Sequence, residues 1–175
     1  MNYSLIRVCS TADGPGLRVS VYFSGCQLAM EGHACKGCHN SKAWDPRSGK
    51  KWDADSENKV IRSLSKSYIS GLSVLGGEPL SDFNIDGVID LVKKCKEEFG
   101  ATKDIWLWTG YNLDDRINEP KVQQLLSYVD MVVDGPFEED KHLINLKFRG
   151  STNQRVLKIE KGNKVNSYID FTGRI

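Results

Sequence analysis

Three cysteines within one short segment could bind a metal centre. Cys26, Cys35 and Cys38 are spaced C-x8-C-x2-C, and two of the chain's three histidines lie among or beside them. A structural zinc ion takes four protein ligands, which three thiolates and one histidine would supply. A [4Fe–4S] cluster normally takes four thiolates, and with three of them one iron stays open for another ligand. The cysteines alone favour zinc and a cluster equally, and they leave unbound thiols as a weaker alternative.

The two histidines of this segment, His33 and His39, have two alternative roles. Either could be a zinc ligand, as a histidine beside clustered cysteines often is. Either could instead donate a hydrogen bond to a sulfur of the metal centre and tune its potential. The sequence favours the second role slightly.

Small and acidic residues stand where several predicted strands end. They are "GGEP" at 76–79, "TGY" at 109–111 and "DG" at 134–135. Glycine lets the backbone approach a ligand closely, and Glu78 adds a carboxylate. Such oxygen acceptors suit the ammonium group of an α-amino acid. The alternative is that each glycine only ends its strand.

The elements that must position these residues alternate between strands and helices. Apolar and β-branched runs predict strands at 17–23, 72–77, 104–110, 131–135 and 154–160, and apolar stripes of helical spacing predict helices at 56–68, 84–99 and 120–129. This alternation indicates βα units and a mostly parallel α/β sheet. Since ligands of such sheets bind beyond the carboxyl ends of the strands, we expect the cysteine loop at 24–40 to meet the glycine-rich strand ends there.

Length and composition predict a single domain, residues 1–175, with an ordinary core. The chain is 39% hydrophobic and 27% charged with a formal net charge of +1, so no broad field indicates nucleic acid or a membrane surface as a partner. The N-terminal segment lacks the basic-then-apolar order of a signal peptide, which favours the cytoplasm. Thiols stay reduced there, which favours metal binding by the three clustered cysteines. Cys9 and Cys95 stand alone and are expected to be small, buried or half-buried side chains.

Several stretches resemble one known family. They are "DGPGLRVSVYFSGC", "CKGCHN", "LGGEPL", "KDIWLWTGY", "VVDGPFEED" and "FRGSTNQR", in this order between Asp13 and Arg155. On these motifs the chain resembles the radical S-adenosylmethionine (SAM) enzymes, and within them the proteins that activate anaerobic ribonucleoside-triphosphate reductases. The resemblance implies one radical SAM domain, folded as an incomplete (β/α)6-type open barrel of about six mostly parallel strands.

One departure from the family pattern lies in the cysteine loop. The family spacing is usually C-x3-C-x2-C, whereas five extra residues separate Cys26 from Cys35 here, within "QLAMEG". Loop-closure entropy grows slowly with length, so the longer loop costs about 0.9 kcal/mol. Binding of a metal centre outweighs that cost, and we expect the three sulfurs to keep their places.

The resemblance also implies roles for individual residues. Cys26, Cys35 and Cys38 would bind three irons of a [4Fe–4S] cluster and leave the fourth iron to SAM. The implied SAM contacts are Gly76, Gly77 and Glu78 at the methionine ammonium, Gly37, Cys38 and His39 beside the adenosine, and Thr109 and Gly110 at the ribose or carboxylate. Asp13, Gly14 and Arg18 match a motif near the active-site mouth whose role stays open, as do the roles of Asn153 and Gln154.

The activity that the resemblance implies is an oxidoreductase reaction with a protein substrate. An electron donor such as flavodoxin reduces the cluster, and SAM is cleaved to methionine and a 5′-deoxyadenosyl radical. That radical removes hydrogen from a glycine of the reductase large subunit and leaves a glycyl radical. Neither nucleic acid nor a membrane is an expected partner.

Three other functions compete with this interpretation. A small radical SAM enzyme of the 7-carboxy-7-deazaguanine synthase type is favoured mildly by the long cysteine spacing, but "KDIWLWTGY" and "RGSTNQR" count against it. Activation of a different glycyl-radical enzyme would differ only in the partner. A non-catalytic zinc-binding module would leave the glycine-rich strand end without a function.

Overall fold

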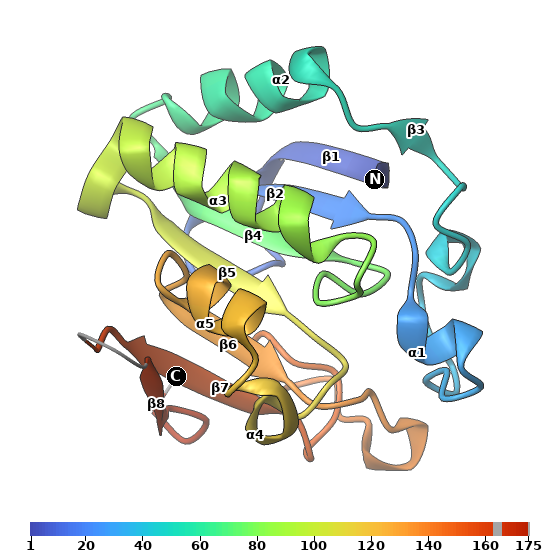
Figure 1. Cartoon of the computed structure of the whole chain (residues 1–175). Coiled ribbons are helices and arrows are strands. Elements are labelled where there is room, and N and C mark those ends of the chain that lie inside the picture. The colour runs from blue at the N-terminus through green and yellow to red at the C-terminus, as the bar shows by residue number, and fades with distance from the viewer. Residues whose placement is uncertain (163–165, 175) are drawn as a thin grey trace.

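The computed structural model describes residues 1–162 and 166–174, and its described strands form one mixed sheet in the order β3-β1-β2-β4-β5-β6-β7-β8 (Figure 1). The strands are β1 (Asn2–Ser10), β2 (Leu17–Phe23), β3 (Lys50–Lys51), β4 (Ile69–Gly76), β5 (Asp104–Trp108), β6 (Met131–Asp134), β7 (Arg155–Glu160) and β8 (Ser167–Asp170). The helices are α1 (Gln27–Met30), α2 (Ala54–Leu64), α3 (Ile85–Phe99), α4 (Leu113–Arg116) and α5 (Pro120–Leu126), with short 3-10 turns at Ser41–Ala43, Gly100–Thr102 and Glu139–Lys141.

The α/β class is confirmed, but the expectation of a mostly parallel sheet is wrong. Only β2, β4, β5 and β6 are parallel neighbours, and the two strands on each side of them pair antiparallel. Parallel neighbours need a crossover of a dozen or more residues, which the short connections from β1 to β2 and from β7 to β8 cannot supply. The open barrel of about six parallel strands is therefore not confirmed.

The longer predicted elements are present. The predicted helix at 84–99 is α3, which ends at Gly100 with φ +55°. The predicted helix at 56–68 is α2, shifted toward the N-terminus because the Asp53 carboxylate caps it by accepting from the Ser56 amide at 2.9 Å. Cys95 is buried on α3 as expected, whereas Cys9 is exposed because it lies on β1, whose side chains are mostly exposed.

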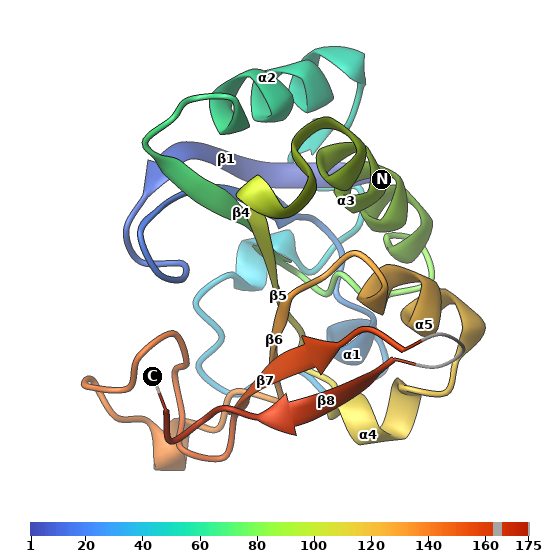
Figure 2. The same cartoon turned by 90° about the vertical axis from the view of Figure 1, so that its left-hand side faces the viewer.

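The sheet separates two apolar clusters, because successive side chains of a strand point to opposite faces. Ile105 and Leu107 of β5 pack in the main core with α3, while Trp106 and Trp108 belong to a second cluster on the other face. Figure 2 shows the sheet curving from β1 to β8, with α2, α3 and α5 along its outer side. The inner side of the curve carries the aromatic cluster and is the side on which the functional residues gather.

Candidate active site

A cavity of about 480 Å³ lies at the carboxyl ends of the parallel strands. It is lined by residues from every segment that the sequence singled out, namely Cys35, Cys38 and His39 of the cysteine loop, Gly76 and Gly77 after β4, Thr109 and Gly110 after β5, and Gly135 after β6. Its size falls in the range of small-molecule sites. The predicted convergence of the cysteine loop with the strand ends is therefore present in the structure.

The three cysteines are free thiols in three positions of one loop. Cys26 is buried and directly precedes α1, whereas Cys35 and Cys38 are half-buried. The amide of Cys38 donates to the carbonyl oxygen of Cys35 at 3.2 Å, and the intervening Gly37 has φ +73°. Cys35 and Cys38 line the cavity, while Cys26 and Gly37 do not.

Burial raises the pKa of the Cys26 thiol to about 11, and the Glu78 carboxylate and the other two thiols act in the same direction. Burial likewise raises the pKa of Cys35, with Cys38 and Glu78 adding to it. Neighbouring negative charge thus opposes ionisation of Cys26 and Cys35 in addition to burial. A bound metal centre would reverse this effect, because coordination deprotonates a thiol outright.

The extra residues of the loop fold into a compact turn. The amides of Met30 and Glu31 donate to the carbonyl oxygens of Cys26 and Gln27, and the amide of His33 donates to that of Leu28 at 2.7 Å. The Gln27 amide also donates to the Ser81 hydroxyl at 3.0 Å. The extra residues thus fold into one short helix, α1, and the turn that follows it. His33 is exposed and does not line the cavity, while His39 does.

Glycine is required at the end of β4. Gly76 has φ +124°, and an added Cβ would lie 2.2 Å from the carbonyl oxygen of Phe23. A Cβ at Gly77 would lie 2.1 Å from the carbonyl oxygen of Gly25. Any other residue would push the strand end away from the cysteine loop, so these glycines bring backbone and loop together.

Glu78 lies behind the cavity wall and joins two strand ends. Its side chain is buried, and its carboxylate accepts from the Leu80 amide at 2.9 Å, the Thr109 hydroxyl at 2.8 Å and the Gly110 amide at 2.7 Å. Burial raises the pKa of Glu78, and these hydrogen bonds oppose the rise. The carboxylate therefore fixes Thr109 and Gly110, two residues of the cavity wall, relative to the end of β4.

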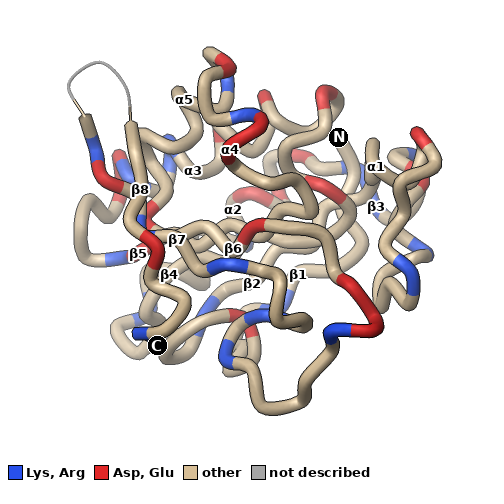
Figure 3. The backbone as a smooth tube through the Cα atoms, turned by 90° about the horizontal axis from the view of Figure 1, so that it is seen from below, with Lys and Arg blue, Asp and Glu red and all other residues tan. Residues whose placement is uncertain are grey.

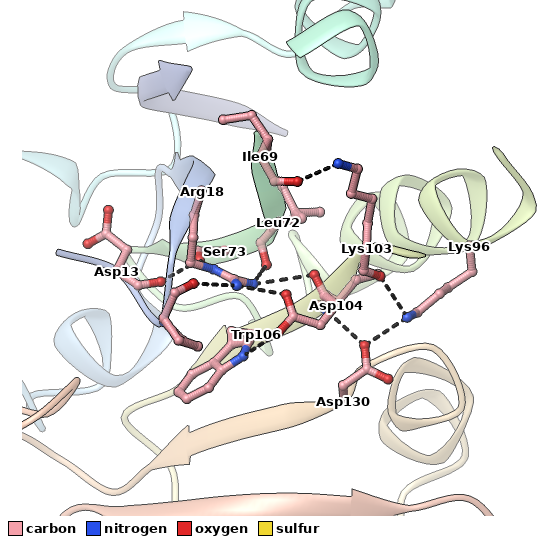
Figure 4. A network of polar contacts seen from close by, with 12 residues as sticks. Asp13, Arg18, Ile69, Leu72, Ser73, Lys96, Lys103, Asp104, Trp106 and Asp130 are labelled. Atoms are coloured by element: carbon pink, nitrogen blue, oxygen red, sulfur yellow. Dashed lines mark hydrogen bonds and ion pairs between the residues drawn. The ribbon is translucent and has the colours of Figure 1, made fainter. Parts of the chain in front are cut away.

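Arg18 is the centre of a buried polar network beneath the cavity (Figure 4). Its Nε donates to the Ser73 hydroxyl at 2.7 Å, and its two terminal nitrogens donate to the Asp104 carboxylate at 2.7 Å and the Leu72 carbonyl at 2.8 Å. The Ser73 hydroxyl in turn donates to the carbonyl oxygen of Asp13 at 2.5 Å. Arg18 thereby ties the loop before β2 to β4 and β5.

This network presents Asp13 to the cavity, which it lines together with Tyr22. The Asp13 carboxylate accepts from the Tyr22 hydroxyl at 2.8 Å and from the Ser10 hydroxyl at 2.7 Å. Burial and the hydrogen bond to Asp13 raise the pKa of Tyr22, so the phenol stays protonated. Asp13 and Arg18, which the sequence left without a role, are thus a cavity residue and the residue that holds its loop.

A family model and several known proteins are similar to this chain. A family model described as "4Fe-4S single cluster domain" matches residues 12–157. An anaerobic ribonucleoside-triphosphate reductase-activating protein of Enterobacteria phage T4 is 40% identical over 156 residues, which cover 89% of this chain and 93% of the relative. Proteins of the same name from Vibrio cholerae and Escherichia coli K12 are 39% and 35% identical, over 88% and 89% of this chain and 96% and 97% of theirs. The chain belongs to this family of activating proteins.

The three clustered thiols of this chain suit a cluster in number. In the part of the chain that the structure describes, no three His, Cys, Asp or Glu side chains are arranged to hold a single ion. A cluster needs no such convergence, because each thiolate binds its own iron. Two free thiols on the cavity wall and a third, buried thiol in the same loop match in number the ligands of a centre with one open iron.

Residues that the sequence analysis did not name as site residues form another wall of the cavity. Trp108 stacks on Trp106 with ring centroids 5.7 Å apart, and its indole nitrogen donates to the carbonyl oxygen of Phe148 at 2.8 Å. Phe148 has φ +63°, a left-handed conformation that is uncommon outside glycine. Arg149 follows it on the cavity wall. The motifs "WLW" and "FRG" were the available signals, but neither indicates a direction for its side chains.

Asn153 and Gln154 hold the segment that carries this wall. The Gln154 side chain accepts from the Gly150 amide at 2.8 Å and donates to the Gly135 carbonyl oxygen at 3.0 Å. Asn153 donates to the carbonyl oxygen of Pro136 at 2.8 Å. Both therefore connect the start of β7 to the loop after β6.

No helix among the described residues has the length and apolar character needed to cross a bilayer.

Proposed function

We propose that this protein activates an anaerobic ribonucleoside-triphosphate reductase by forming a glycyl radical on its large subunit. Relatives that carry this description in their names are up to 40% identical and match over most of the chain. The observation that supports the chemistry is the cavity, which joins two of the three clustered thiols to the glycine-rich ends of β4, β5 and β6.

Cys26, Cys35 and Cys38 would hold three irons of a [4Fe–4S] cluster, and SAM would occupy the cavity beside the fourth iron. When bound, the cluster supplies the electron that splits SAM into methionine and a 5′-deoxyadenosyl radical. The radical then takes one hydrogen atom from a glycine Cα of the reductase, which yields 5′-deoxyadenosine and the glycyl radical. The reaction consumes one electron and one SAM for each radical formed.

The chain's own residues position SAM and exclude water. Backbone groups of Gly76 and Gly77 offer oxygen acceptors for the methionine ammonium, at a point where no side chain obstructs them. Glu78 acts through Thr109 and Gly110, which it holds at the cavity wall. The aromatic wall of Trp108 and Phe148 keeps a reactive radical away from bulk water.

The first experiment tests the metal centre. Anaerobically purified protein should contain about four irons per chain and show a broad absorption band near about 400 nm. A Cys35→Ala variant should lose both, while Cys9→Ala should keep them, because Cys9 is exposed near the end of β1 that pairs with the start of β2, and the cysteine loop follows the other end of β2. A colourless protein that retains about one zinc after reconstitution would refute the cluster and favour the binding module.

The second experiment tests the reaction. Reduced, reconstituted protein, SAM and an anaerobic reductase should give a glycyl radical signal by electron paramagnetic resonance and one 5′-deoxyadenosine for each radical. SAM cleavage without a radical on the reductase would contradict the proposed partner. A 7-carboxy-7-deazaguanine product formed from its pterin precursor would identify the competing radical SAM activity instead.

A further inference from the structure

A second groove lies on the outer side of the cysteine loop. It measures about 380 Å³ and lies between α1 and residues 44–47, with Ala29, Met30, Trp44 and Pro46 among its lining. Met30 is 62% exposed. The groove shares no lining residue with the active-site cavity.

The groove is connected directly to a proposed cluster ligand. The amide of Cys26 donates to the carbonyl oxygen of Trp44 at 2.9 Å, and the amide of Gly25 donates to that of Ala43 at 2.7 Å. A single hydrogen bond therefore links the groove wall to the backbone of Cys26. The rate of electron transfer through protein falls steeply with distance. A donor must therefore dock where the path to the proposed cluster is short.

One side of the groove is cationic. Residues 42–51 carry Lys42, Arg47, Lys50 and Lys51 against one carboxylate, Asp45, which pairs with Arg47. The carboxylates of Glu31 and Asp82 lie on the α1 side, so the excess of positive charge is confined to the 42–51 side. The three lysines are exposed, and none of them takes part in the ion pairs found among the described residues. Figure 1 places α1 and β3 at one edge of the molecule, and Figure 3 shows both blue and red segments along that edge.

We propose that this edge docks an acidic one-electron carrier protein, with Met30 at the apolar centre of the contact and the lysines at its rim. The inference rests on the proposed function, because a cluster must be present to receive the electron. The carrier loses one electron and the metal centre gains it, and no bond or proton changes. The reductase needs the cavity, so the groove on the outer side stays free for a transient complex of small area, as electron-transfer encounters are.

Binding is the first test, with oxidised flavodoxin as the probe. The variant Lys42→Glu/Lys50→Glu should bind it about tenfold more weakly at low salt, and the salt dependence of binding should flatten. The control Arg62→Glu/Lys66→Glu makes the same change in net charge with exposed residues at the far end of α2. It should bind within about twofold of the unaltered protein. Equal weakening in both variants would show a net-charge effect only and overturn the proposal.

The second test is the rate of cluster reduction, which is measured by the bleaching of the visible absorption band. Reduced flavodoxin should reduce the Lys42→Glu/Lys50→Glu and Met30→Glu variants about tenfold more slowly, while dithionite, which needs no docking, reduces all variants at one rate. Unchanged rates with flavodoxin, or a defect seen only in binding of the reductase, would overturn the proposal. Failure of the proposed function is separate, since it would abolish SAM cleavage with dithionite in every variant.

Discussion

Replacing Glu78 with glutamine tests whether this carboxylate holds the cavity wall. Glutamine has the same shape, and its carbonyl oxygen can still accept from Leu80 and Thr109. Its NH2 group would face the Gly110 amide, which now donates to the carboxylate at 2.7 Å. Two donors would then oppose each other in a buried site, because Glu78 is only 1% exposed.

The expected loss of stability follows from that one contact. An unsatisfied buried donor costs about 1–3 kcal/mol, and relief of the buried charge, which raises the pKa of Glu78, offsets part of it. We expect a net loss of about 1–2 kcal/mol, which corresponds to a fall in Tm of about 2–8 °C for a chain of this size. Glu78→Ala, which removes all three acceptors, should cost more.

The assay is thermal unfolding of the metal-free protein followed by circular dichroism. Metal-free protein separates the effect on the wall from any effect on cluster or SAM binding. Glu98→Gln on the exposed face of α3 is the matched control and should leave Tm unchanged. A Glu78→Gln variant with an unchanged or higher Tm, but weaker SAM binding when reconstituted, would refute the positioning role and favour direct contact with SAM.

Three further predictions concern the network, the wall and the isolated thiols. Arg18→Lys keeps the charge but not the several-point contact, so urea unfolding should show a loss of about 2 kcal/mol; an unchanged midpoint would contradict the network. Trp108→Leu removes the hydrogen bond to Phe148. The free-energy change calculated from the rise in KM for SAM should exceed the loss in the free energy of unfolding, and the reverse order would indicate a purely structural residue. Burial raises the pKa of Cys95 from 9.0 to about 12, which lowers its thiolate fraction at pH 8 about 1,000-fold. Alkylation followed by mass spectrometry should therefore label exposed Cys9 at least about 100-fold faster than Cys95, and equal rates in the native protein would be evidence against the burial.

The parts of the fold with a strong sequence pattern were predictable. The strands that became β2, β4, β5 and β6 read as apolar runs because both of their faces are covered, and α3 showed a complete apolar stripe. Their carboxyl ends had to meet at one edge, which is why the convergence of Gly76, Thr109 and Gly135 with the cysteine loop followed from the sequence.

The parts that were missed have weak patterns or depend on distant contacts. β1 and β8 lie toward the sheet edges with mostly exposed side chains, so their residues show no regular alternation. The wall made by Phe148 and Arg149 comes from a long loop without periodicity. The direction of the Glu78 carboxylate also could not be predicted, because it depends on amides from two other segments.

The short helix α1 has a consequence for how related sequences should be searched. The chain leaves Cys26, turns once and continues toward Cys35 with its backbone hydrogen bonds satisfied locally. The number of residues between the first two cysteines is therefore not a measure of the distance between their sulfurs. A search pattern that fixes three residues there would discard chains like this one, whereas a pattern that fixes the C-x2-C pair and the glycines after β4 would retain them.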